Sequence, residues 1–157
     1  MNYLGLRVNS SKISVVILKS IDNKNEIICC ENINLPSALS FPQMLHYVRN
    51  TILNLVREYS IEVSALKLTE GNSFGVDSQR LNIEGVIQEA FAGSTIRKIF
   101  LGRAKSISKR LSVNDTQFKQ LTKGKVNPSS LDKDNWKLCS NEQLREACLV
   151  ALGAIND

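Results

Sequence analysis

The chain has 157 residues, enough for one domain with a sizeable core and too few for two ordinary ones. Its composition, 43% hydrophobic and 22% charged, is typical of a soluble globular protein, and no apolar run reaches the roughly 18 residues of a membrane span. The net charge of +5 favours an anionic partner, and the absence of an evident signal peptide predicts a cytoplasmic protein with no membrane partner.

Two strands joined by a tight turn are predicted over residues 3–19. Apolar residues alternate with others from Leu4 to Val8, the period of two that marks a strand. Residues 9–11 (Asn-Ser-Ser) supply turn chemistry, because their short side chains hydrogen-bond to nearby backbone. Residues 13–18 are almost continuously apolar and β-branched, as expected of a strand covered on both faces.

A third strand is predicted over residues 26–35, after a turn cluster at residues 22–25. Three strands joined by short turns form an antiparallel meander. The adjacent Cys29 and Cys30 then point to opposite faces of the strand. With no Cys-x-x-Cys pair and a single histidine in the chain, the four cysteines predict reduced core thiols rather than a zinc site.

A long amphipathic helix is predicted next, opening at residues 40–43 (Ser-Phe-Pro-Gln). The hydroxyl of Ser40 can cap the first turn while Gln43 reaches back, and apolar residues recur at helical spacing up to residue 59. Three elements follow: a strand over residues 63–69, a helix over about 78–92 and a strand over 95–101. Glu70 stands at the C-terminal end of the first of these strands.

The stretch that follows carries most of the positive charge. Residues 97–125 hold nine basic side chains and one acid, a net of +8, so the rest of the chain carries −3. A short basic helix is predicted at about residues 103–111, where Lys105 and Lys109 share one face. This asymmetry favours nucleic acid as the partner of a cytosolic protein, and a solvated basic face without a ligand is the alternative.

The last part of the chain is predicted to be a loop followed by a helix. Periodicity weakens from residue 112, and we expect a mobile basic loop at about residues 112–139, with Trp136 as an anchor and a helical turn or two at residues 114–122 as an alternative within it. Residues 140–143 (Ser-Asn-Glu-Gln) repeat the capping box, with Ser140 as the cap of the final helix. That helix is apolar on both sides, which predicts burial between layers.

The order of strands and helices predicts an α/β fold, a mixed sheet covered on both faces in a single domain over residues 1–157. This order resembles the ribonuclease-H-like superfamily, and more narrowly its Holliday-junction-resolvase-like (RuvC-like) branch. Three short motifs carry the resemblance: Leu-Gly-Leu-Arg at residues 4–7, Leu-Lys-Leu-Thr-Glu at 66–70 and Glu-Ala-Cys-Leu-Val-Ala at 146–151. It implies a five-stranded sheet with an antiparallel three-stranded meander and two parallel strands.

The likeness covers about residues 2–111 and 140–155, and it leaves the basic stretch between them unmatched. A group of uncharacterised bacterial proteins, known only by a domain-of-unknown-function label, is similar in the strand end at Thr69-Glu70, the helix at Ile83-Glu84 and the helix that holds Glu146.

Members of the superfamily cleave phosphodiesters with two metal ions held by carboxylates from these places. The resemblance therefore implies Glu70 and Glu146 as catalytic and metal-binding candidates, with Glu142 as the alternative on the last helix, and Mg²⁺ or Mn²⁺ as the cofactor of a nuclease. Where resolvase-like enzymes place an aspartate, this sequence has Arg7, whose guanidinium cannot bind a cation. Three interpretations of Arg7 stay open: an ion pair with Glu70 or Glu146, a phosphate contact, and a neighbour of a one-metal site.

These observations predict a catalytically degenerate resolvase-like domain that binds nucleic acid without cleaving it, and they assign no certain cofactor to it. The residues expected to contact nucleic acid are Arg7, Arg103, Lys105, Lys109, Arg110, Lys123 and Lys125. One alternative is a metal-dependent nuclease that acts on structured or single-stranded nucleic acid through Glu70 and Glu146. The other is an interaction or assembly module, either a homodimer or a complex with a protein partner.

Overall fold

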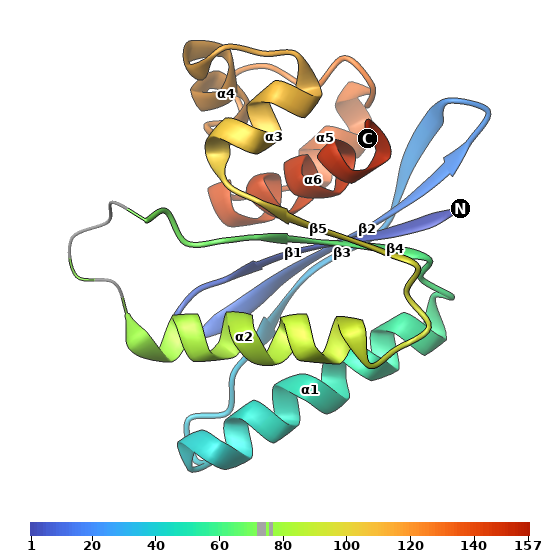
Figure 1. Ribbon diagram of the computed structural model, residues 1–157. Coiled ribbons are helices and arrows are strands. Elements are labelled where there is room, and N and C mark those ends of the chain that lie inside the picture. Colours follow the sequence, from blue (N-terminus) through green and yellow to red (C-terminus); the bar gives the residue numbers. More distant parts are fainter. Residues whose placement is uncertain (72–74, 76) are drawn as a thin grey trace.

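A computed structural model describes the chain except for residues 72–74 and 76, and it shows a mixed sheet with helices on both faces (Figure 1). The strands are β1 (Asn2–Val8), β2 (Lys12–Ile21), β3 (Lys24–Asn34), β4 (Val63–Lys67) and β5 (Lys98–Gly102). The sheet has the order β3-β2-β1-β4-β5, in which β1 pairs antiparallel with β2 and parallel with β4. The predicted meander with two parallel strands is confirmed.

The helices form one layer on each side of this sheet. They are α1 (Phe41–Glu58), α2 (Ser78–Ala92), α3 (Ala104–Leu111), α4 (Asp115–Thr122), α5 (Lys133–Leu138) and α6 (Glu142–Ile155). In Figure 1, α1 and α2 lie below the sheet, and α3 to α6 lie above it. Among the residues that the structure describes, no helix has the length and apolarity that a membrane crossing needs.

The two hairpins of the meander form as their turn residues dictate. The side-chain oxygen of Asn9 accepts hydrogen bonds from the backbone N–H groups of Ser11 and Lys12, both at 2.8 Å. In the second turn, Asp22 and Asn23 both adopt positive φ, 50° and 62°, a conformation that Asn and Asp tolerate well. Because this turn needs only two residues, β3 begins at Lys24, two residues earlier than predicted.

The alternation along β1 divides the apolar core into two parts. Leu4, Leu6 and Val8 are fully buried against the α1 and α2 layer. On the other face, Gly5 lies against α6, where a Cβ atom would stand 2.0 Å from the carbonyl oxygen of Ala147. The close approach of this helix to the centre of the sheet explains why its side chains are buried on nearly every side, as predicted.

The four cysteines are free thiols. Cys29 packs with the core on the α1 side and Cys30 with the core on the α6 side, so their predicted opposite orientation is confirmed. The Sγ atom of Cys30 lies 3.9 Å from that of Cys139, which is buried.

Two predictions for the C-terminal third are wrong. The stretch expected to be a loop at residues 112–139 contains α4, where a helical turn or two was considered, and α5, which was not expected, while Trp136 packs into the core as an anchor would. These helices have only 8 and 6 residues and bury few side chains each, too short for a periodic pattern to stand out. The cap of α6 is Asn141 instead of Ser140, and its side chain accepts from the backbone N–H of Leu144 at 2.9 Å.

Candidate functional site

Two cationic side chains lie next to each other at the C-terminal ends of β1 and β4. Arg7 is the Cα partner of Lys67 in the parallel ladder, so both side chains project from the same face, the one that α6 covers. On the other side of Arg7, Ser14 donates a hydrogen bond to the side chain of Asn32 at 2.7 Å. Polar side chains on adjacent strands therefore line the edge of the sheet at which open α/β sheets bind their ligands.

Arg7 is held by α6. Its Nε donates to Oε2 of Glu146 at 2.8 Å, and its Nη1 donates to the carbonyl oxygen of Val8. Both side chains of the ion pair are only 15% exposed, which strengthens their attraction relative to a pair in water. Of the two ion pairs considered from the sequence, the structure forms the one with Glu146.

Lys67 is the second buried cation, 4% exposed. Its Nζ donates to Glu70 and to the carbonyl oxygen of Leu68, each at 2.8 Å. Glu70 also accepts the backbone N–H of Ala104 at 2.9 Å, at the N-terminus of α3, where a negative charge is favoured. Burial alone would raise the pKa of Glu70, but the hydrogen bonds from Lys67 and Ala104 outweigh it and lower this pKa below its usual value.

The structure adds a third acid, Glu84 of α2, which the sequence analysis did not assign to the site. Glu84 is 2% exposed and accepts hydrogen bonds from the backbone N–H of Thr69 at 2.7 Å and from the Thr69 hydroxyl at 3.0 and 3.1 Å. It thereby fixes the end of β4 to α2. The signal in the sequence is a carboxylate beside Ile83 and Ile87 on the apolar face of a helix, where an acid without a partner would be costly.

Arg80 precedes Glu84 by one turn of α2 and also escaped prediction. Its Nε lies 4.0 Å from Oε1 of Glu84, and its side chain is 18% exposed. Burial lowers the pKa of the Arg80 guanidinium, and the nearby charge of Arg7 lowers it further. Arg80 and Arg7 are thus like charges that repel each other in a partly desolvated place.

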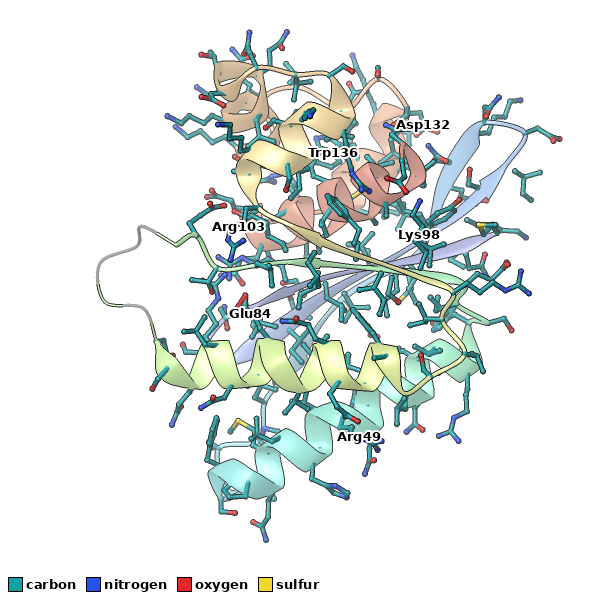
Figure 2. The ribbon with its side chains drawn as sticks, viewed as in Figure 1. Arg49, Glu84, Lys98, Arg103, Asp132 and Trp136 are labelled. Atoms are coloured by element: carbon teal, nitrogen blue, oxygen red, sulfur yellow. The ribbon has the colours of Figure 1, made fainter. Side chains whose placement is uncertain are left out.

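We refer to these residues, together with Arg103, as the charged cluster. Arg103, the residue before α3, donates from its Nε to the carbonyl oxygen of Thr69 at 3.2 Å. Figure 2 shows Arg103 and Glu84 reaching toward the same end of the sheet from α3 and from α2. The members of the cluster are Arg7, Lys67, Glu70, Arg80, Glu84, Arg103 and Glu146. Four cations against three carboxylates leave one net positive charge.

The donor set of this cluster does not fit the pair of divalent metal ions that the ribonuclease-H-like resemblance implies. Each carboxylate is already held by the protein: Glu146 by Arg7, Glu70 by Lys67, and Glu84 by Thr69. Within the described part of the chain, no three His, Cys, Asp or Glu side chains are grouped so that they could hold a metal ion. Magnesium needs several oxygen ligands, and the two cations beside the acids oppose a further positive charge.

The other predicted site residues fall into three groups. Glu142 is exposed in the first turn of α6. Arg110 donates to the carbonyl oxygen of Gly153 at 3.2 Å, pairs with Asp157 at 2.7 Å and lies 3.8 Å above the centre of the Phe100 ring, so it joins α3 to α6 and β5. Five of the predicted basic residues are exposed just before α3, on α3 or just after α4, and we call them the basic surface: Arg103, Lys105, Lys109, Lys123 and Lys125.

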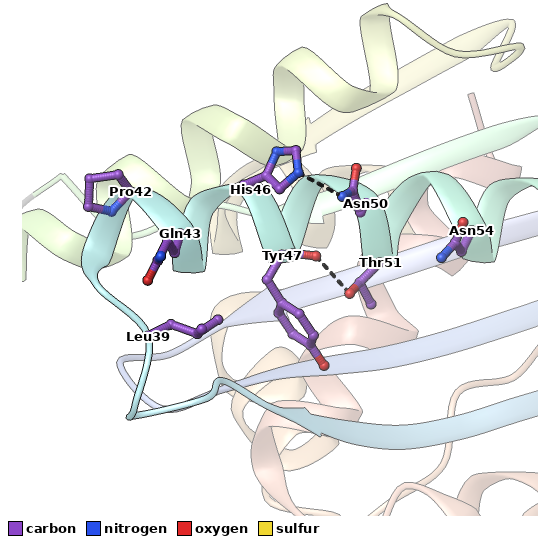
Figure 3. Close-up of a pocket in the computed structure, with 8 residues that line it drawn as sticks. All are labelled: Leu39, Pro42, Gln43, His46, Tyr47, Asn50, Thr51 and Asn54. Atoms are coloured by element: carbon purple, nitrogen blue, oxygen red, sulfur yellow. Dashed lines mark hydrogen bonds between the residues drawn. The ribbon is translucent and has the colours of Figure 1, made fainter.

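A hollow of about 610 Å³ runs along the outer face of α1 (Figure 3). Its side chains bond locally: Asn50 lies 3.1 Å from the ring of His46, and the Thr51 hydroxyl donates to the carbonyl oxygen of Tyr47. The lining residues carry no acid, lysine or arginine, and α1 lies on the side of the sheet opposite α6. This hollow is therefore separate from the charged cluster.

Comparison with known proteins gives matches in structure but none in sequence. No protein-family model matches the chain, and no curated protein matches its sequence. Thermus thermophilus RuvC has a TM-score of 0.72 at 10% identity over 99% of this chain and 94% of that one, and the structure titled as its complex with a Holliday junction substrate gives 0.71.

Two eukaryotic and viral resolvases also match. The yeast mitochondrial Holliday junction resolvase has a TM-score of 0.65 at 15% identity over 98% of this chain and 77% of that one. The fowlpox virus resolvase, in complex with Holliday junction DNA, has a TM-score of 0.55 at 12% identity over 97% of this chain and 95% of that one. At such identities the likeness establishes the fold alone, so the predicted ribonuclease-H-like fold, as seen in resolvases, is confirmed.

Proposed function

We propose that this protein binds nucleic acid on a resolvase-like scaffold and does not cleave it. The observation that carries the proposal is the pairing of Arg7 with Glu146 and of Lys67 with Glu70 at the end of the sheet. The guanidinium of Arg7 stands where the resemblance implies a metal ligand, and the ammonium group of Lys67 projects beside it from the neighbouring strand. The carboxylates therefore serve to compensate buried positive charge.

The basic surface supports the binding half of the proposal. Its lysines are exposed, and the chain segment that contains them carries a net charge of +8. Two of the structural matches, RuvC and the fowlpox virus resolvase, are solved with Holliday junctions bound. Exposed lysines contact phosphates without reading bases, so we expect weak sequence preference.

The salt dependence of binding tests this assignment. With about five phosphate contacts, affinity for a DNA four-way junction should fall on the order of several hundredfold between about 50 and 200 mM salt. Fluorescence anisotropy with labelled junctions and single strands measures it. The double variant Lys105→Gln/Lys109→Gln should bind more weakly and show a shallower salt slope.

Arg49→Gln is the matched control, because Arg49 lies on α1 and pairs with Glu89 at 3.0 Å. It should leave affinity and slope unchanged. An affinity that is constant across this salt range, or equal losses in the control and the lysine variant, would contradict the assignment of the basic surface.

Cleavage is the alternative activity, and it is tested with the same substrates. We expect no product from junctions or single strands in Mg²⁺ or Mn²⁺, because the acids that would hold the ions are paired with cations. Product formation that Glu70→Gln abolishes would show a metal-dependent nuclease instead. Light scattering with and without DNA separates both activities from an assembly module, which would oligomerise without DNA.

A further inference from the structure

The charged cluster contains more hydrogen-bond donors than its carboxylates can accept. A guanidinium has five N–H groups, and within the described part of the chain Arg7 commits only its Nε, to Glu146, and its Nη1, to a backbone carbonyl. Lys67 uses two of its three donors. Three donors of Arg7 and one of Lys67 are left over at one end of the sheet.

Arg80 adds an independent observation: its Nε is a buried hydrogen-bond donor without a partner among the described residues. The nearest carboxylate, Glu84, is 4.0 Å away, and both of its oxygens already accept from Thr69. A buried donor without a partner is destabilising, and a charged one more so.

Arg7 and Arg80 are also like charges in a partly desolvated place. The side chains are 15% and 18% exposed, and Arg7 contributes to the lowered pKa of Arg80. Glu146 and Glu84 each neutralise part of this charge, but the cluster as a whole keeps one excess positive charge. An anion with several oxygen acceptors placed beside the two guanidinium groups would satisfy the free donors and relieve the repulsion.

We propose that Arg7, Lys67 and Arg80 form a seat for a phosphate monoester, the group at the end of a nucleic acid strand. This inference rests on the proposed nucleic-acid binding only in one respect: the phosphate is expected to belong to a nucleic acid strand. A monoester carries about −1.5 to −2 charge at neutral pH and has three terminal oxygens, which matches two guanidinium forks and one ammonium.

The burial of these donors favours the end of a nucleic acid strand over an internal phosphodiester. An internal phosphodiester is flanked by a nucleoside on each side, and it carries one charge and two unbridged oxygens. The donors of Arg7 and Arg80 lie mostly below the surface, where a phosphate attached on one side reaches them more easily. The basic surface then contacts the backbone of the same strand, which approaches past the exposed Arg103.

The experiment compares oligonucleotides of one sequence that end in a 5′-phosphate, a 3′-phosphate or only hydroxyl groups. We expect about tenfold tighter binding of a phosphorylated end, and competition by a nucleoside monophosphate and by inorganic phosphate at higher concentration. In Arg80→Gln the preference should vanish, while the affinity for the unphosphorylated strand stays the same. Arg49→Gln is again the control and should keep the full preference.

Arg80→Lys keeps the charge but lacks the forked guanidinium, so it should retain only a small part of the preference for phosphorylated ends. Circular dichroism checks that each variant is folded. Equal affinities for phosphorylated and unphosphorylated strands, or a preference that Arg80→Gln leaves intact, would overturn the seat. Neither result would affect the proposed nucleic-acid binding. Conversely, if no oligonucleotide binds but inorganic phosphate still protects the protein against thermal unfolding in an Arg80-dependent way, the seat stands and the nucleic-acid proposal fails.

Discussion

Helix α6 contacts β1 in two chemically opposite ways within two residues of the strand. At Gly5 the contact is apolar and so close that backbone nearly touches backbone, with the small residues Ala147 and Ala151 opposite. At Arg7 the same helix supplies Glu146, and the contact becomes a largely buried ion pair. The apolar contact at Gly5 holds α6 on the sheet. The residues at Arg7 and Glu146 can therefore differ from a set of metal ligands while the fold stays like that of a resolvase.

The apolar contact should give the largest loss of stability when it is disturbed. In Gly5→Ala the new Cβ would meet the Ala147 carbonyl oxygen at 2.0 Å and the Ala151 side chain at 2.8 Å, so backbone must move. We expect a loss of about 3 kcal/mol or more in the free energy of unfolding, measured with denaturant. Gly85→Ala is the control: nothing lies within 4 Å of its Cβ, and a helix interior should gain up to about 1 kcal/mol. Equal effects at both glycines would show that α6 is not clamped here.

The ion pair should give the second largest loss. Glu146→Gln leaves Arg7 without its charge partner in a place that is 15% exposed, so we expect a loss of about 2–4 kcal/mol. The double variant Arg7→Met/Glu146→Leu should lose clearly less than the sum of the two single changes, because no unpaired charge remains. Additive losses across this double-mutant cycle would mean that the two side chains stabilise the protein independently.

The same comparison shows how far the sequence could lead. Alternation along residues 4–8, the turn at Asn9 and the cap at Ser40 are local patterns, and each was predicted with nearly correct bounds. The order of these elements was enough to identify the fold. Glu146 was placed on the last helix as a candidate acid, but its pairing with Arg7 is a contact between residues 139 positions apart. No local pattern specifies such a contact.

The positions of Lys67 and Arg80 in the site could not be predicted from the sequence. The sequence shows that Lys67 interrupts an apolar strand, but only the register of β4 on β1 sets it beside Arg7. Arg80 looks like an ordinary charge near the start of a helix, and its burial depends on how α2 lies against the sheet. The sequence also predicts a loop at residues 71–77, and part of it, residues 72–74 and 76, lies outside the described chain.

The ion pair of Lys67 and Glu70 should make a smaller, pH-dependent contribution to the free energy of unfolding. Because the folded-state pKa of Glu70 is lowered by Lys67 and Ala104, its ionised form stabilises the protein above the unfolded-state pKa, and this stability is lost as pH falls through the folded-state pKa. Glu70→Gln should therefore cost about 1 kcal/mol at neutral pH, less than Glu146→Gln, because the Glu70 side chain is 45% exposed and water screens its charge. The difference from the unmodified protein should shrink from about pH 5 to about pH 3, as denaturant unfolding across that range would reveal. A difference that does not change with pH would mean that Glu70 acts by shape rather than by charge.

The smallest effect is expected at Glu142, one turn before Glu146 on the same helix. Glu142 is exposed in the first turn of α6, where its only expected contribution is the interaction of a negative charge with the helix N-terminus. Glu142→Gln should thus cost only about 0.3–1 kcal/mol, and its effect should diminish at high salt, while the loss in Glu146→Gln persists because that pair is shielded from solvent. Unfolding of the two variants at about 0.05 and 1 M salt makes the comparison. If Glu142→Gln instead matched Glu146→Gln in size and salt response, the two acids would act together, and the charged cluster would extend along α6.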